Sequence, residues 1–233
     1  MWMQYPKTQS LFSVDDQYLV GSDLLVKPVV APGITSTVVQ FPTTDCWYDV
    51  DTMQRMADVP SRDPNSSVAV TVASDIDKIP VYQRGGSIVT RKLRLRRSSH
   101  LMAMDPYTLY VALGDDGTAA GDLYMDDEVT FAYERKRDYV VASFSSSWGE
   151  GVAVQNSVRV GNDEGEVLGR AGDRVVERIV VMGVERNPGG LSLFRRTSSA
   201  GSALEFQYDS LTKVLVIRKP EVTACEDFHI QIV

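Results

Sequence analysis

Short runs of apolar and β-branched residues, separated by Gly, Pro, Asp and Ser, dominate the chain from about Leu24 onward. Brief runs rich in Val, Ile and Tyr and bounded by such residues are typical of β-strands. The pattern therefore predicts an all-β protein. The runs are LLVKPVV, STVVQF, CWYDV, SVAVTV, IPVY and SIV in the first half, and YTLYVAL, DLYM, TFAY, YVVASF, RVVERIVVM, LEFQY, KVLVIRK and FHIQIV in the second.

Two segments depart from this pattern. A helix is predicted over Leu11–Gly21, because Ser10 or Ser13 could cap its N-terminus and Gly21 could end it. The stretch Gly149–Gly172 is rich in Gly, Asp, Glu and Asn. It is predicted to be a long surface excursion between strands.

The chain is predicted to contain two β units that meet at Arg91–His100, where apolar and basic residues alternate before two serines. The second unit is expected to be a sandwich. Natural protein termini are usually polar, yet the first dozen residues hold four large apolar side chains. The four side chains are Trp2, Tyr5, Leu11 and Phe12. The chain is therefore expected to start in the middle of a fold.

Charge and cysteine content exclude several classes of protein. The 233 residues carry a formal net charge of −7, which disfavours binding to nucleic acid or to an anionic membrane. Cys46 and Cys225 lie far apart without zinc-ligand spacing, and two free thiols are expected rather than one bridge. No apolar run approaches the roughly 18 residues of a membrane span, and the first residues lack a signal-peptide pattern. No cofactor or metal is expected.

Adjacent acids are the obvious candidates for catalysis, at Asp15–Asp16, Asp115–Asp116 and Asp126–Asp127. Neighbouring residues point to opposite faces of a strand and are splayed around a helix, so each pair can present at most one carboxylate to a common substrate. Asp116-Gly117 is more simply a turn, because Gly tolerates positive φ. No catalytic, substrate-binding or metal-binding residue is therefore predicted.

Other polar features favour structural roles. The basic run Arg91–Arg97 lacks interleaved aromatic residues and is expected to be a linker that pairs with acids of neighbouring units. His229 lies in an alternating terminal strand and is expected to be partly exposed there. Gly85-Gly86 is expected to form a tight turn. Asn65 begins an N-glycosylation sequon, Asn-Ser-Ser, which matters only in a secretory protein.

Three spaced segments resemble the C-terminal part of glycoside hydrolase family 31 α-glucosidases. They are DDQYLVGSDLLVKPV at Asp15–Val29, IPVYQRGGSIV at Ile79–Val89 and GDLYMDDEVTFAY at Gly121–Tyr133. The family commonly has Asp-Asp-Gly where this chain has Asp126-Asp127-Glu128, and a residue with a Cβ disfavours positive φ. The turn at Glu128 is therefore expected to be shifted.

The resemblance implies the end of a (β/α)8 barrel at residues 1–23, a proximal C-terminal β domain at 24–97 and a distal C-terminal β-sandwich domain at 98–233. Met1–Pro6 would be the last barrel strand. The family's catalytic aspartates lie in barrel segments with WxDMNE-like and GxDxGGF-like signatures, and neither occurs in this sequence. The chain is therefore expected to be a non-catalytic part of a retaining α-glucosidase that supports an upstream catalytic barrel.

A subgroup of the family gives the most similar segments, at residues 94–99, 177–183 and 214–220. That resemblance implies an enzyme of the endoplasmic reticulum lumen that removes α-1,3-linked glucose from N-glycans and has a noncovalent β subunit. Other specificities within the family stay open, because the barrel selects the substrate. A stand-alone β-sandwich that binds carbohydrate also stays open, with Trp47, Tyr48 and Trp148 as candidate sugar-stacking residues.

Overall fold

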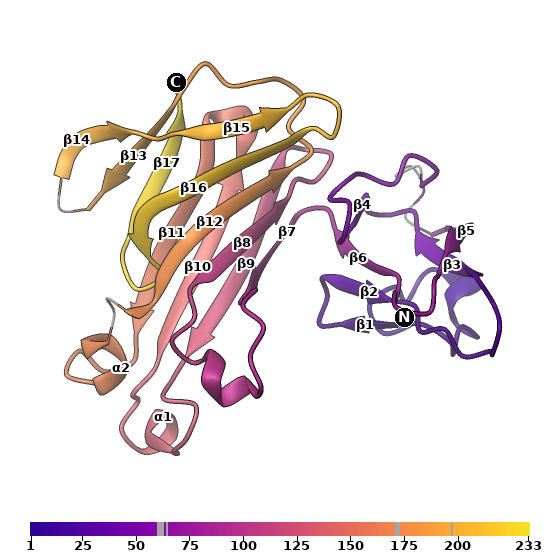
Figure 1. Cartoon of the computed structure of the whole chain (residues 1–233), viewed down its shortest axis with the longest axis horizontal. Helices are drawn as coiled ribbons and strands as arrows, with labels where there is room; N and C mark the ends of the chain where they lie inside the picture. Colours follow the sequence, from indigo (N-terminus) through magenta and orange to yellow (C-terminus); the bar gives the residue numbers. More distant parts are fainter. Residues whose placement is uncertain (60–62, 64, 171–172, 197) are drawn as a thin grey trace.

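The computed structural model describes residues 1–59, 63, 65–170, 173–196 and 198–233, and strands dominate it (Figure 1). The all-β prediction is confirmed. A smaller unit holds the N-terminus, and a larger unit with long strands holds the C-terminus. The helical segments of the described residues are all short: η1 Gln9–Leu11, η2 Ser99–Met102, α1 Ala132–Arg135, η3 Trp148–Glu150 and α2 Glu166–Gly169.

The smaller unit contains a four-stranded antiparallel sheet in the order β1-β2-β6-β4 and a separate antiparallel pair, β3-β5. Its core gathers aromatic side chains, with Phe41 packed edge-on against Tyr82 at a centroid distance of 4.7 Å. Trp47 and Leu25 are fully buried beside them. The strands are β1 Tyr18–Val20, β2 Leu24–Val26, β3 Ser36–Pro42, β4 Trp47–Asp49, β5 Ser67–Ala73 and β6 Val81–Arg84.

The larger unit is one eleven-stranded sheet in the order β14-β13-β17-β11-β10-β9-β7-β8-β12-β16-β15. Most neighbours are antiparallel, but β8 runs parallel to β12 and β7 runs parallel to β9. The strands are β7 Ser87–Arg91, β8 Tyr107–Ala112, β9 Thr118–Met125, β10 Val140–Ser147, β11 Val152–Val160, β12 Val175–Met182, β13 Leu191–Arg195, β14 Ser198–Ala203, β15 Phe206–Asp209, β16 Val214–Thr223 and β17 Phe228–Ile232.

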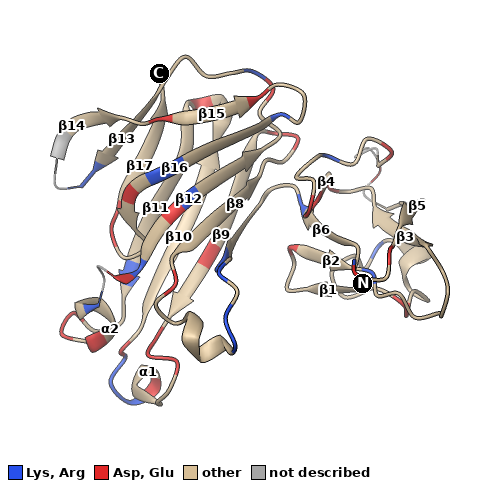
Figure 2. Cartoon of the chain, viewed as in Figure 1, with Lys and Arg blue, Asp and Glu red and all other residues tan. Residues whose placement is uncertain are grey.

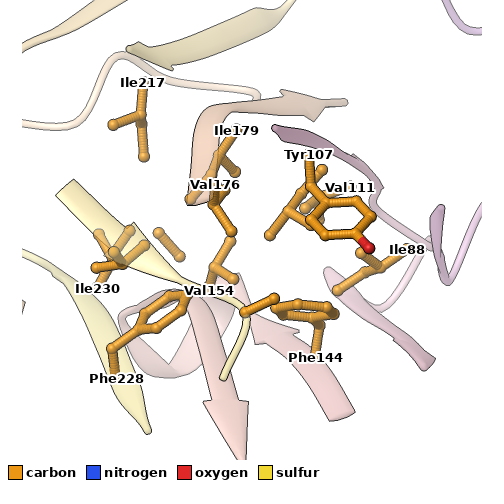
Figure 3. Packing of buried hydrophobic residues seen from close by; sticks show 14 of the residues in the cluster. Ile88, Tyr107, Val111, Phe144, Val154, Val176, Ile179, Ile217, Phe228 and Ile230 are labelled. Atoms are coloured by element: carbon orange, nitrogen blue, oxygen red, sulfur yellow. The ribbon is translucent and has the colours of Figure 1, made fainter. Parts of the chain in front are cut away.

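This sheet folds back on itself, so its two halves share one core (Figure 3). Val111 and Ile179 from one half lie opposite Phe144, Val154 and Ile230 from the other. Along β10, buried residues alternate with more exposed ones, as expected of a strand with one face on a core. The expected sandwich is therefore made by a single curved sheet.

The predicted strand at Met1–Pro6 is wrong. The backbone N–H groups of Gln4 and Tyr5 both donate to the carbonyl of Met1, at 3.1 Å, and the segment forms turns. A strand needs such donors for a neighbouring strand, whereas here they are satisfied locally.

The predicted helix at Leu11–Gly21 is also wrong. Only Gln9–Leu11 is helical, and the following residues extend into β1. Gly21 has a φ of +61° and lies in the turn that joins β1 to β2, so it serves a hairpin and does not end a helix.

The sequence predicts a surface excursion over Gly149–Gly172, but most of this stretch is structured. β11 lies inside the sheet between β10 and β17, and Ala153 and Val154 are fully buried. Apolar and polar residues largely alternate in Val-Ala-Val-Gln-Asn-Ser-Val-Arg-Val, and this pattern indicates the strand. The polar residues of the stretch lie on the exposed face of β11, in the turn after it and in α2.

Gly85-Gly86 forms the expected turn, with a φ of +85° at Gly86. The strands on its two sides belong to different sheets, because β6 pairs with β2 and β4 whereas β7 pairs with β8. The chain therefore passes from the smaller to the larger sheet at this turn. The division into units of 1–23, 24–97 and 98–233 stays a prediction. In the structure, β7 belongs to the larger sheet although its residues fall within the predicted unit 24–97.

Candidate functional site: an apolar N-terminal surface and the joint between the units

Most of the adjacent acids of the sequence form turn hydrogen bonds or ion pairs. Asp116 accepts hydrogen bonds from the backbone N–H and hydroxyl of Thr118, and these lower the pKa of its carboxyl group. Gly117 has a φ of +73°, so the predicted turn is present. In the described part of the chain, no three His, Cys, Asp or Glu side chains gather to hold a metal. Two of the adjacent acids form ion pairs, Asp16 with Lys27 and Asp115 with Arg55.

The turn at Glu128 keeps positive φ, at +59°, so the expected shift is wrong. The Asp126 carboxylate accepts the Glu128 N–H at 2.8 Å, a local bond that favours this turn. The Glu128 carboxylate lies 3.6 Å from the ammonium of Lys92, which links the turn to the basic segment. Asp127 accepts from Thr130, whose hydroxyl is the main cause of the lowered pKa of Asp127.

The basic run Arg91–Arg97 pairs with acids of the larger unit, as its composition predicted. Arg94 lies 3.4 Å from Glu177. Arg96 donates two hydrogen bonds to the Asp105 carboxylate, at 2.7 and 3.0 Å. These hydrogen bonds are the main cause of a lowered pKa at the Asp105 carboxyl group. Paired in this way, the run fixes the connection between β7 and β8.

Acid is expected to weaken the fold through this pair. Because the folded-state pKa of Asp105 is depressed, its stabilisation is present above the unfolded pKa of about 3.9 and is lost as the pH falls toward the folded value. Asp105→Asn should therefore make the free energy of unfolding fall less steeply below about pH 5. Urea unfolding between pH 7 and pH 3 measures this, with Asp163→Asn at an exposed position as control. Equal slopes for the two variants would contradict the assignment.

The candidate sugar-stacking aromatics do not form an exposed platform. Trp47 and Tyr48 are fully buried, as expected of a core strand. Trp148 is half-buried against the core of the larger unit. His229 is exposed on β17 and stacks on Phe194, with ring centroids 4.9 Å apart. The strand prediction for His229 is confirmed.

Exposed apolar side chains gather at the N-terminal end of the smaller unit. Trp2 and Phe12 are 57% and 52% exposed and line one shallow hollow together with Pro6. Met3 beside them is 77% exposed. Soluble domains rarely expose neighbouring large apolar side chains without a partner. Trp2, Met3, Pro6 and Phe12 are called the N-terminal surface below.

Buried residues hold this surface rigidly on the sheet. Of the four apolar residues near the start, Tyr5 and Leu11 are buried in the core of the smaller unit. The Tyr5 hydroxyl donates to the Asp45 carboxylate at 3.0 Å, and burial is the main cause of its raised pKa. Arg84 lies 3.6 Å from the same carboxylate and donates to Asp23 at 3.1 Å. Sequence periodicity did not indicate this network, because its members come from four separate segments.

A second apolar cluster joins the two units. Tyr48 packs against Val180 and Met182 of the larger sheet, and its hydroxyl donates to the Leu113 carbonyl at 2.8 Å. The backbone is close on both sides: a Cβ at Gly85 would overlap the Cys46 sulfur, and one at Gly183 would overlap the Tyr48 hydroxyl. The joint is therefore closely packed at both glycines, and Gly183 also has a φ of +86°, which side chains with a Cβ rarely adopt.

The structure thus shows two joined β-sheet units, adjacent acids that are engaged in turns and ion pairs, and an exposed apolar end. Residues 1–89 match the family model described as "Glycosyl hydrolase family 31 C-terminal domain". Residues 1–89 therefore form a C-terminal domain of glycoside hydrolase family 31, and the whole chain is similar to the C-terminal region of proteins of that family.

Similarity to known proteins extends over the whole chain. It is 37% identical to neutral alpha-glucosidase AB of Homo sapiens over 234 aligned positions, which cover 100% of this chain and 23% of that protein. The catalytic subunit in the crystal structure of the ER glucosidase II heterodimeric complex, which includes the binding domain of the regulatory subunit, matches with a TM-score of 0.84 and 29% identity. The glucosidase II alpha subunit in its "alpha3-Glc2-bound" form matches with a TM-score of 0.83 and 30% identity. Each structural match covers 100% of this chain and 25% of the other.

The chain thus spans about a quarter of the length of these relatives. None of the helices in the described ranges has the length and apolar composition needed to cross a membrane.

Proposed function

We propose that the chain is the non-catalytic C-terminal part of a retaining α-glucosidase of the glucosidase II type, which removes α-1,3-linked glucose from N-glycans. The observation that carries the proposal is the match of the entire chain to the catalytic subunit of the ER glucosidase II complex at a TM-score of 0.84. In a retaining enzyme, one carboxylate attacks the anomeric carbon and a second carboxyl group protonates the departing oxygen. Both groups would lie in the barrel upstream of this chain.

The role of this region would be to support the barrel. The N-terminal surface offers Trp2, Met3 and Phe12 to a neighbouring apolar surface, while Tyr5 and Arg84 fix its position on the sheet. Burial of apolar area contributes about 25 cal/mol per Å², so covering these side chains stabilises the assembly. Through the joint at Tyr48, the larger sheet braces the smaller one.

Location and partners belong to the same proposal. An enzyme of this type would act in the endoplasmic reticulum lumen with a noncovalent β subunit. The solved ER glucosidase II complex, which consists of a catalytic subunit and the binding domain of a regulatory subunit, supports this proposal. Asn65 would then be available for glycosylation, because it is exposed and lies in a turn just before β5.

The native polypeptide tests this proposal. Captured with an antibody against this chain, it is expected to be about four times larger than the 25.8 kDa of these residues and to release glucose from an α-1,3-linked disaccharide in preference to an α-1,4-linked one. Capture in the presence of excess antigen is the control. An inactive native polypeptide near 25.8 kDa would overturn the proposal and favour a stand-alone carbohydrate-binding module.

A further inference from the structure

A row of arginines crosses the outward face of the larger sheet. The strand register pairs Arg91 of β7 with Thr108 of β8, Thr108 with Arg178 of β12, and Arg178 with Arg218 of β16. Residues paired across strands point to the same face, so these four side chains form one line across four strands. The line lies on the face that also carries Tyr110 and the joint, opposite the core. It is called the arginine row below.

The three arginines form no ion pair with a carboxylate within 4.0 Å in the ranges that the structure describes, unlike the neighbouring basic residues. Arg91 stacks its guanidinium on the Tyr110 ring at 4.3 Å, and burial is the main cause of its lowered pKa. Arg178 is half-buried and Arg218 is exposed.

Nearby carboxylates leave the row a surplus of positive charge. Glu177 of β12 lies within ion-pair distance of Arg94, at 3.4 Å, and Asp51 of the smaller unit lies 3.1 Å from Lys78. Glu205 lines a shallow hollow with Arg218 at the far end of the row. Figure 2 shows basic and acidic positions side by side on β12 and β16.

This arrangement is costly for the isolated sheet. Like charges directly opposite each other on paired strands are destabilising, and Arg178 faces Arg218 in this way. Thr108, between Arg91 and Arg178, is fully buried, and its hydroxyl has no hydrogen-bond partner among the described atoms. A buried polar group without a partner is also unfavourable. The repulsion between Arg178 and Arg218 and the unpaired Thr108 hydroxyl thus lie close together. An anionic partner would offset the repulsion.

We propose that the arginine row is the docking site for an extended acidic segment of a protein partner. Strands lie about 4.8 Å apart, so the row spans roughly 14 Å, the length of about four extended residues. A single small anion reaches only neighbouring members of the row. Carboxylates spaced along a segment can pair with all three guanidiniums, whose N–H groups donate bidentate hydrogen bonds. The site is independent of the glucosidase activity proposed above.

A labelled ten-residue polyglutamate peptide tests the site on the intact protein that carries this chain, by fluorescence anisotropy at low salt. Arg178→Gln combined with Arg218→Gln is expected to weaken binding about tenfold, through loss of two charge-assisted contacts. The matched control, Arg135→Gln with Arg159→Gln, removes the same charge from other exposed positions and is expected to leave the affinity within about twofold.

The melting temperature gives a second readout. The row variant should melt no lower than the unmodified protein, because like-charge repulsion is removed. If it melts lower, Arg218→Gln alone, at the exposed end of the row, must still weaken binding about threefold. Equal affinities for the row and control variants would overturn the proposal. So would inorganic phosphate binding as tightly as the peptide, which would make the row a site for small oxyanions.

Discussion

Trp47→Ala is expected to lower the free energy of unfolding of the smaller unit by about 3–5 kcal/mol, the usual cost of removing a large buried aromatic side chain. Trp47 is fully buried between Phe41 and the rest of the aromatic core. Its indole N–H also donates to the Pro42 carbonyl at 3.0 Å, and that bond is lost with the side chain. Urea unfolding followed by the fluorescence of the remaining tryptophans measures the loss.

Trp2→Ala removes the same side chain from an exposed position and is the matched control. In the 233-residue chain alone, it should change the unfolding free energy by less than about 0.5 kcal/mol. In the intact enzyme it should lower the melting temperature, because the N-terminal surface is proposed to be covered there. If Trp2→Ala leaves both forms unchanged, the N-terminal surface does not dock on the barrel. If Trp47→Ala costs under 1 kcal/mol, the described core is wrong.

Gly121→Ala should separate strands of the larger sheet. A Cβ at Gly121 of β9 would overlap the backbone carbonyl of Ile88 in β7. Backbone cannot move aside as a flexible side chain can, so a loss of about 1–3 kcal/mol or more is expected. Thermal unfolding monitored by circular dichroism measures it.

Gly149→Ala is the corresponding control, since a Cβ there would meet no atom within 4 Å. Alanine at such a position restricts the unfolded chain and should be neutral or stabilising by up to about 1 kcal/mol. Equal melting temperatures for the two variants would show that β7 and β9 are not in close contact at Gly121.

The errors made from the sequence share a cause. Leu11–Gly21 carries capping residues and a terminal glycine, and those are also the residues of a turn between two strands. The composition of Gly149–Gly172 averages the exposed face of β11 with the polar residues after it, and so hides the strand. In both segments, pairing with another strand decided the conformation, namely with β2 for the first and with β10 and β17 for the second. Local residue preferences do not contain that information.

Glu128 shows the same limit at one residue. Its Cβ disfavours positive φ, but the Asp126 carboxylate and Lys92, which is distant in sequence, hold it at +59°. Local preference alone therefore gave the wrong expectation, while the tertiary partner could not be identified before folding placed it.

By itself, the sequence determined the all-β class, the positions of most strands, the buried Trp47 and Tyr48, and the resemblance to family 31, because alternation and short motifs are local properties of a chain. Only the tertiary structure decided that β7 joins the larger sheet, that Tyr48 and Gly183 build a joint, and that Arg91, Arg178 and Arg218 share one face. These are relations between residues as much as 135 positions apart, such as Gly183 and Tyr48. They are set by strand register and packing, to which distant segments contribute together.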